Sequence, residues 1–406
     1  MNGGVSVPLV ALVLPLRLAP HEGSPPQQAL VWLEGLGGET REHSLQEEPL
    51  VDPRSKGAWL VRPRVVGTQA TRGEGLRAQV TLAGGDRLNG RVRGGNGEVL
   101  YLDWVGGDGL SLDVSRIESL VFPERVAARA GTTLQPPSEG DRLYVLSSES
   151  LDEVDGTVEE FSAEGVRLDG VLGSKLFRWE EIAALYVEVF EDGVSAKSGP
   201  EVPVVVDLVD GSRMRAALTR LDPLGAELRL SGGMGVRIPL VQLVELAVDD
   251  GRLVFLSDLE AVQEEGAGSP FDDELGMRWP HKVDRSVLGD ELLAGGQRYL
   301  RGIGTHAPTR VTWELDRDYQ AMSGRVAIDD SSLLLSEWAR GSVVFRVWGD
   351  DEMLWESRVL RGGDAPQSLL VPSLAGVRRL TLEVDPVGDF GGDRANWLRV
   401  RLVRAD

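Results

Sequence analysis

The stretch Tyr299-Leu-Arg-Gly-Ile-Gly-Thr-His-Ala-Pro308 decides the fold of the C-terminal part of this chain. Two later stretches accompany it, Gly341-Ser-Val-Val-Phe-Arg-Val-Trp-Gly-Asp350 and Val359-Leu-Arg-Gly-Gly-Asp-Ala-Pro366. Short runs of alternating apolar and polar residues lie between them, which is typical of strands with one buried and one solvated face. The pattern predicts a sandwich of antiparallel strands with binding loops at its ends. Because glycines precede His306, we expect residues 302–306 to be one of these loops.

Further blocks in the same order strengthen this interpretation: Trp279-Pro-His-Lys-Val-Asp-Arg-Ser-Val287, Arg379-Leu-Thr-Leu-Glu-Val-Asp385 and Gly391-Gly-Asp-Arg-Ala-Asn-Trp397. With these blocks, residues 253–406 resemble an NPCBM-type carbohydrate-binding module. The resemblance implies a galactose-binding-like, jelly-roll β-sandwich of the kind found beside glycoside hydrolases and in secreted bacterial proteins. It also implies that a glycan or glycoconjugate is the partner.

Sugars are recognised by aromatic rings that stack on the apolar ring face and by polar side chains that hydrogen-bond the hydroxyls. The residues and the resemblance together favour eight carbohydrate-binding candidates: His306, Arg301, Asp329, Asp330, Trp338, Arg361, Asn396 and Trp397. Each has a structural alternative. The histidine would pin its own loop, the arginines would form internal salt bridges, and the aspartates would shape turns.

Two features depart from the family pattern. Members often carry Asp-His-Ala-Asp-Trp where this chain has Asp393-Arg-Ala-Asn-Trp397, so Arg394 and Asn396 replace two family residues. Trp338 lies in a longer segment than the short glycine-rich loop common at its place. These differences favour an alternative in which the sugar pocket has decayed and the sandwich serves protein interaction or envelope assembly.

A candidate calcium site lies in the stretch that contains Asp385, Asp389 and Asp393. Ca²⁺ prefers carboxylate and carbonyl oxygens, and glycines let the backbone curve around an ion. The stretch lacks the spacing of an EF-hand. The alternative is an acidic turn that faces solvent.

The residues before 253 predict tandem small β units. Three stretches of about 50 residues repeat apolar runs of period two with Gly/Asp turns, at 76–126, 140–191 and 201–250. Each resembles, loosely, a five-stranded barrel of the Sm-like or SH3-like type. Residues 26–75 are expected to be an irregular segment, either with a strand or two or as a partly ordered arm, and residues 1–25 are a candidate leader peptide. We expect the repeats to be a scaffold or spacer.

Composition restricts the partners. The formal net charge of -21 would repel phosphate backbones, so nucleic acid is an unsuitable partner. The 406 residues include no cysteine, which excludes disulfides and thiolate metal sites. No run approaches the roughly 20 apolar residues of a transmembrane helix. The family resemblance implies a secreted, periplasmic or cell-envelope location, with other envelope proteins as further candidate partners.

Catalytic motifs are missing from the sequence. It contains no His-Glu-x-x-His, no Gly-x-Ser-x-Gly, no phosphate loop and no dinucleotide fingerprint. The leading hypothesis is therefore a non-catalytic, all-β glycan-binding protein. A hydrolase stays open as a further alternative, because paired carboxylates for glycoside hydrolysis are defined by spatial and not by sequence spacing.

Overall fold

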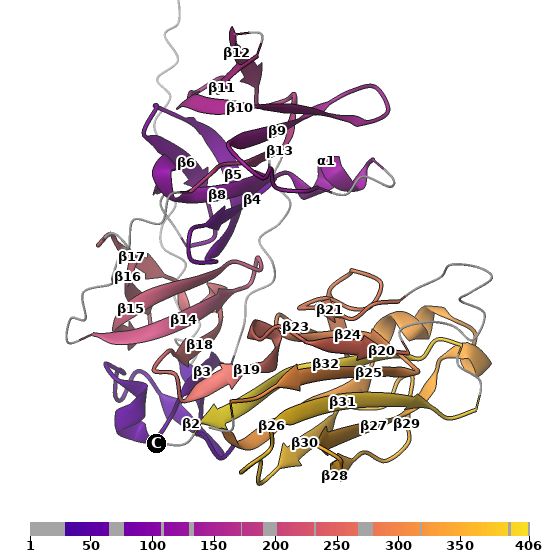
Figure 1. Cartoon of the computed structure of the whole chain (residues 1–406). Coiled ribbons are helices and arrows are strands. Elements are labelled where there is room, and N and C mark those ends of the chain that lie inside the picture. The colour runs from indigo at the N-terminus through magenta and orange to yellow at the C-terminus, as the bar shows by residue number, and fades with distance from the viewer. Residues whose placement is uncertain are drawn as a thin grey trace, which may run out of the picture.

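The computed structural model describes residues 29–64, 77–106, 109–129, 134–171, 173–189, 201–230, 233–266, 279–316, 319–388 and 391–404. The candidate leader at 1–25 lies outside them. The described residues are mostly β-strands, with one short α-helix, α1 (Pro123–Ala127), and several 3-10 turns. The predicted all-β fold class, with small β units before a C-terminal sandwich, is confirmed (Figure 1).

Three units of five strands share one strand order, in which the first strand pairs with both the second and the fifth. The first unit comprises β4 (Arg77–Leu82), β5 (Arg87–Gly95), β6 (Val99–Asp103), β7 (Leu110–Asp113) and β8 (Ile117–Val121). The second comprises β9 (Asp141–Leu146), β10 (Leu151–Phe161), β11 (Gly165–Gly170), β12 (Gly173–Arg178) and β13 (Ile182–Tyr186). The third comprises β14 (Val202–Leu208), β15 (Arg213–Asp222), β16 (Gly225–Leu230), β17 (Gly235–Ile238) and β18 (Leu243–Val248).

The second strand of every unit carries a bulge at the corresponding place, after Val92, Val158 and Leu218. A bulge bends its strand and increases the local twist, which lets a short meander curl back so that its first and last strands meet. Short 3-10 turns precede the fifth strands of the first and third units, η2 (Val114–Arg116) and η3 (Leu240–Gln242). That the three stretches fold independently stays a prediction.

Residues 26–75 were expected to be irregular, and this is wrong for the described part. Three strands lie there, β1 (Leu30–Glu34), β2 (Thr40–Ser44) and β3 (Leu60–Pro63), with the 3-10 turn η1 (Pro53–Lys56). β3 pairs with β18, placing Leu60 opposite Ala247. The short apolar runs are strands because they are buried against a distant part of the chain, which local periodicity does not show.

The C-terminal part is a sandwich of two antiparallel sheets. One sheet contains β21 (Lys282–Val283), β24 (Gly302–His306), β32 (Arg394–Arg404), β26 (Tyr319–Ile328) and β30 (Gln367–Val371), with β19 (Leu253–Phe255) on β32. The other contains β20 (Gln263–Glu265), β25 (Thr309–Glu314), β31 (Arg379–Pro386), β27 (Ser342–Gly349) and β28 (Glu352–Glu356), with β29 (Leu360–Arg361) on β27. A separate hairpin, β22 (Leu292–Ala294) and β23 (Gln297–Tyr299), lies beside them.

The core of the sandwich lies between these sheets. Trp397 of one sheet packs edge to face on Phe345 of the other, with ring centroids 5.0 Å apart. Residues 302–306 are the strand β24 and not a loop, because their amides pair with β32 and their glycines admit close neighbours. A Cβ at residue 304 would lie 2.4 to 2.6 Å from the backbone of residues 285–287, so only glycine fits there.

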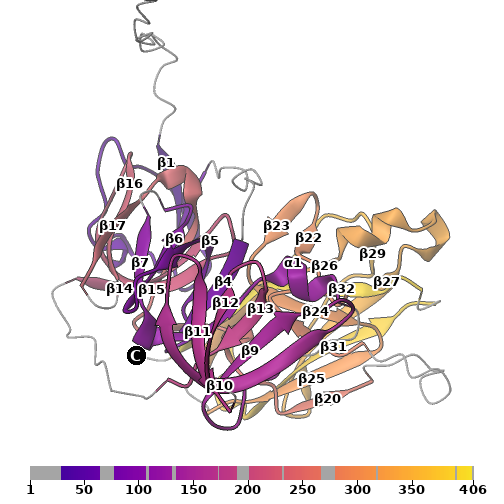
Figure 2. The same ribbon diagram turned by 90° about the horizontal axis from the view of Figure 1, so that it is seen from above.

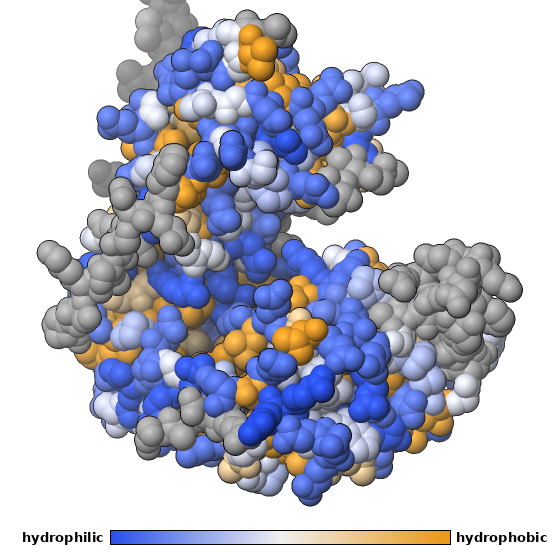
Figure 3. Space-filling view, viewed as in Figure 1, coloured by the Kyte–Doolittle hydropathy of each residue, from blue (hydrophilic) through white to orange (hydrophobic). Residues whose placement is uncertain are grey.

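The sandwich lies directly against the third unit and the N-terminal strands. Figure 1 shows β19 beside β3, and their side chains share one buried cluster. Figure 2 shows the sandwich extending to one side of the units before it. Glu34 of β1 forms ion pairs with Arg401 and Arg399 of β32. Arg399 also pairs with Glu245 of β18. In the space-filling view the surface is hollowed between the second unit and the sandwich (Figure 3).

Candidate functional site

Four of the predicted binding residues lie at one end of the sandwich. His306 ends β24 and is in register with Arg394 at the start of β32. Asp330 belongs to the 3-10 turn η5 (Asp330–Leu334) and Trp338 to η6 (Glu337–Ala339). The backbone around residue 339 packs on Gly392, and Arg361 of β29 pairs with the start of β27.

His306 is half-buried and its ring stacks on Trp279, with centroids 5.7 Å apart and an angle of 22° between the planes. Its Nδ1 lies 2.8 Å from the carbonyl oxygen of Ala307. Because a carbonyl only accepts, Nδ1 carries the proton and the neutral ring leaves Nε2 as an acceptor. Burial lowers the pKa of His306, and the nearby charge of Arg394 lowers it further. The imidazole is therefore neutral near pH 7.

Trp338 and Arg361 face solvent. The Trp338 side chain is 82 % exposed, and Leu334 on the same segment is 89 % exposed. The Arg361 guanidinium makes no hydrogen bond or ion pair within the described part of the chain, while its backbone amide donates to Asp364. A flat indole and a free guanidinium can stack on a sugar ring and donate to its hydroxyls.

Asp330 has a structural role in addition to its predicted one. Its two carboxylate oxygens accept from the amides of Gly295 and Gly296, at 3.0 and 2.8 Å. It therefore fixes the turn of the β22–β23 hairpin against the site. Sugar contact by this half-buried carboxylate stays a prediction.

Three predicted residues cannot contact a surface ligand, because they are buried. Asp329 is 1 % exposed, and Asn396 and Trp397 are fully buried. Asp329 caps η5 through the amide of Ser331, and it accepts from the side-chain amide of Asn396 at 2.6 Å. Trp397 lies in the core between the sheets. Their role is to hold β26, β32 and η5 in place.

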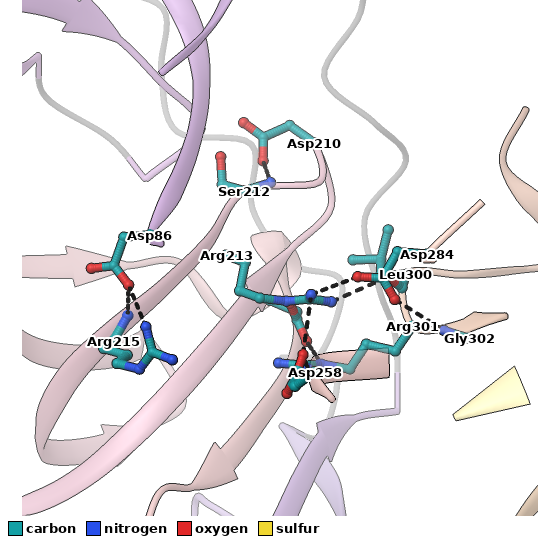
Figure 4. Close-up of polar contacts among 11 residues, drawn as sticks. Asp86, Asp210, Ser212, Arg213, Arg215, Asp258, Asp284, Leu300, Arg301 and Gly302 are labelled. Atoms are coloured by element: carbon teal, nitrogen blue, oxygen red, sulfur yellow. Dashed lines mark hydrogen bonds and ion pairs between the residues drawn. The ribbon is translucent and has the colours of Figure 1, made fainter. Parts of the chain in front are cut away.

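Arg301 is also buried, at 3 % exposure. It forms the internal salt bridges that were the structural alternative to sugar binding. Its Nε donates to Asp207 of β14 at 2.9 Å, and its terminal nitrogen donates to both carboxylate oxygens of Asp258. Arg213 of β15 joins this cluster through Asp207 and Asp284 (Figure 4). The charges of Arg301 and Arg213 lower the pKa of Asp207 although burial opposes this. The cluster joins the third unit to the sandwich.

The described carboxylates of the candidate calcium site do not converge. Asp385 is ion-paired with Arg346 at 2.9 Å, and Asp393 is buried and accepts from the amide of Ser342. Asp389 lies outside the described residues. Within the described ranges, no three His, Asp or Glu side chains are placed to share a metal. Calcium binding stays a prediction that titration can test.

Two residues of the site, Trp279 and Arg394, are missing from the predicted set. Trp279 stacks on the histidine, and Arg394 donates to the carbonyl and hydroxyl of Ser331. Both belong to blocks that indicated the fold. An aromatic and a basic side chain beside strand ends indicate a binding role. Their place next to His306 is set by the fold, because both are distant from it in sequence.

Comparison with known proteins identifies the family of the sandwich. The family model of the NPCBM/NEW2 domain matches residues 252–403. These residues form an NPCBM/NEW2 domain. The predicted resemblance is therefore confirmed for the sandwich, and the NPCBM/NEW2 domain has the fold of a carbohydrate-binding module.

Two curated proteins named as glycosidases are similar to part of this chain. Alpha-1,3-galactosidase B of Akkermansia muciniphila is 34% identical over 120 residues, which are 29% of this chain and 14% of that protein. The chain thus spans a small part of its curated relatives, between 7% and 14% of their length.

Solved structures similar to this chain include a CBM51 module from Clostridium perfringens GH95 in complex with methyl-galactose. It is 25% identical, covers 37% of this chain and 99% of its own, and has a TM-score of 0.32. The tandem CBM51 modules of a family 98 glycoside hydrolase from Streptococcus pneumoniae are 12% identical, cover 92% of this chain and 88% of their own, and have a TM-score of 0.33. In the described part of this chain, no helix is long and apolar enough to span a bilayer.

Proposed function

We propose that the NPCBM/NEW2 domain of this chain binds glycans, without catalysing a reaction, at the end of the sandwich where β24 stops. The observation that carries the proposal is the half-buried, neutral His306 stacked on Trp279, at the same end as the exposed Trp338. A glycan partner implies that the protein acts outside the cytoplasm, in a secreted, periplasmic or cell-envelope location.

The chemistry of this end suits a sugar. The indole of Trp338 offers a face on which the apolar side of a pyranose ring can stack. Nε2 of His306 can accept from one hydroxyl, and the Arg361 guanidinium can donate to two neighbouring oxygens. Neutral and cationic groups at this end also avoid the repulsion that the acidic chain as a whole would exert on anionic glycans.

The contacts of the third unit and of the N-terminal strand β1 with the sandwich support a scaffold role. Ion pairs from β1, β14, β15 and β18 reach the sandwich at the end opposite His306. The binding end is therefore held away from the repeats. Other envelope proteins would contact the repeats, with their exposed strand edges as the expected surface.

Isothermal titration with galactosides tests the proposal, since the A. muciniphila relative is named for α-1,3-linked galactose. We expect saturable binding by the intact chain, and about tenfold or greater loss of affinity in His306→Ala and in Trp338→Ala, because each loses a stacking or hydrogen-bond partner. His43→Ala is the matched control. His43 is also half-buried and lies 2.7 Å from a carbonyl oxygen, but it belongs to β2.

Two outcomes would contradict the proposal. The folded protein would bind no member of a broad glycan array, or it would bind with an affinity that both variants leave unchanged. Capture of one stable partner from a native extract, together with the first outcome, would favour the alternative of a protein-interaction module. Turnover of chromogenic glycosides that survives repurification would favour the hydrolase.

A further inference from the structure

A polar cavity of about 290 Å³ lies where the first unit, the third unit and the sandwich meet. Its lining includes Gln79 and Arg87 from the first unit, Asp210 and Arg213 from the third, and Arg285 and Arg298 from the sandwich. Asp284 and Leu300, which also line it, precede β24, whereas His306 ends that strand. The cavity is thus separated from the proposed glycan site by the length of β24, about 13 Å.

Four arginines line this cavity, and two of them have carboxylate partners. Arg213 pairs with Asp207 and Asp284, at 2.7 and 2.6 Å. Arg298 pairs with Glu291 at 2.7 Å and donates to the carbonyl oxygen of Val209. These two guanidinium groups are neutralised within the protein.

Arg87 and Arg285 have no such partner. Neither side chain forms a hydrogen bond or ion pair within the described part of the chain, and Nε of Arg87 is buried without an acceptor. Burial lowers the pKa of Arg87 and the charges of Arg213 and Arg285 add to this, whereas the carboxylates of Asp284 and Asp207 oppose it. Arg87 is half-buried and Arg285 is exposed, so an anion between them would give both guanidinium groups a partner and would satisfy the buried Nε of Arg87.

Asp210 supplies the second unpaired group. It is 7 % exposed, and one carboxylate oxygen accepts from the amide of Ser212 at 2.9 Å (Figure 4). Its other oxygen, Oδ2, is buried and has no hydrogen-bond partner among the described residues. Burial raises the pKa of Asp210, so this group is poised to share a hydrogen bond with a hydroxyl.

We propose that this junction cavity binds a small hydroxylated carboxylate, of the uronic acid class, with its carboxylate between Arg87 and Arg285 and a hydroxyl on Asp210. The volume lies at the lower end of the range for ligand pockets, about 300–1,000 Å³, and so suits a single sugar ring. A monoanion fits better than a phosphate dianion, since only two cations are unpaired and Asp290 and Glu291 also line the cavity.

Isothermal titration of the intact chain with glucuronate tests this site, with glucose, acetate and sulfate as comparison ligands. We expect saturable binding of glucuronate, none of glucose, which lacks the carboxylate, and at least tenfold weaker binding of acetate and sulfate, which lack the hydroxyls. Arg285→Gln and Arg87→Gln should each weaken glucuronate binding about tenfold or more, as loss of a charged hydrogen bond does. Arg285 is exposed, so its variant is expected to fold normally.

Arg93→Gln is the matched control. Arg93 lies on β5 like Arg87, but its side chain is 66 % exposed and pairs with Asp103 away from the cavity. Its variant should bind glucuronate as the unaltered chain does. The proposal is overturned if the folded chain shows no saturable glucuronate binding, if both arginine variants keep full affinity, or if sulfate binds as tightly as glucuronate and displaces it.

Discussion

Arg301 shows how one residue can belong to a binding motif in sequence and to a structural junction in the fold. Its buried guanidinium joins the buried Asp207 to Asp258 at the surface. We expect Arg301→Ala to lower the free energy of unfolding by about 3 kcal/mol, because removing one partner of a buried ion pair leaves the other charge uncompensated. Urea titration followed by tryptophan fluorescence measures this loss.

Arg93→Ala serves as the comparison at the residue scale. Its pair with Asp103 is largely exposed, so the expected loss is below about 1 kcal/mol. Equal midpoints for Arg301→Ala and the unaltered chain would show that the buried cluster does not stabilise the junction.

At the scale of elements, the strands β1 and β3 extend the third unit and carry Glu34 to the sandwich. Leu60 of β3 is fully buried and lies opposite Ala247 of β18. We expect Leu60→Ala to lower the free energy of unfolding by about 2–5 kcal/mol, the usual effect of a cavity in a well-packed core. Deletion of residues 1–64 should have a larger effect, because it also exposes the edge of β18 and favours aggregation.

Leu224→Ala is the control for the strand prediction, since Leu224 is 72 % exposed on the third unit. Its expected effect is within about 0.5 kcal/mol. Thermal melting and size-exclusion chromatography of Leu60→Ala, Leu224→Ala and the deletion variant, each beside the unaltered chain, provide the readout. A deletion variant that stays monomeric and melts with the intact chain would mean that the N-terminal strands are dispensable.

At the scale of the whole molecule, the NPCBM/NEW2 domain is packed against the units before it. Phe255, Arg301 and Arg401 are buried where the domain contacts those units. A fragment of residues 251–406 would expose them. It would remove Asp207 from Arg301, which keeps Asp258, and it would leave Arg399 and Arg401 without their carboxylates. We expect the fragment to melt several degrees below the sandwich in the intact chain, measured by differential scanning calorimetry.

The same fragment should bind glycans with the affinity of the intact chain, because His306 and Trp338 lie at the far end of the sandwich. A fragment that melts with the intact chain would show that the two parts are thermodynamically independent. Loss of glycan binding by a folded fragment would show that the repeats contribute to the site.

The sequence by itself determined the all-β class, because the alternating burial of a strand appears as alternating apolar and polar neighbours. It also determined the sandwich, because the NPCBM blocks fall in order along the chain. It also indicated the residue types of the site, among which His306, Asp330, Trp338 and Arg361 do meet at one end. Only the tertiary structure decided which motif residues face solvent. Arg301 and Trp397 are buried, and β3 is a strand, because their partners Asp207, Phe345 and β18 are far away in sequence and burial depends on such distant contacts.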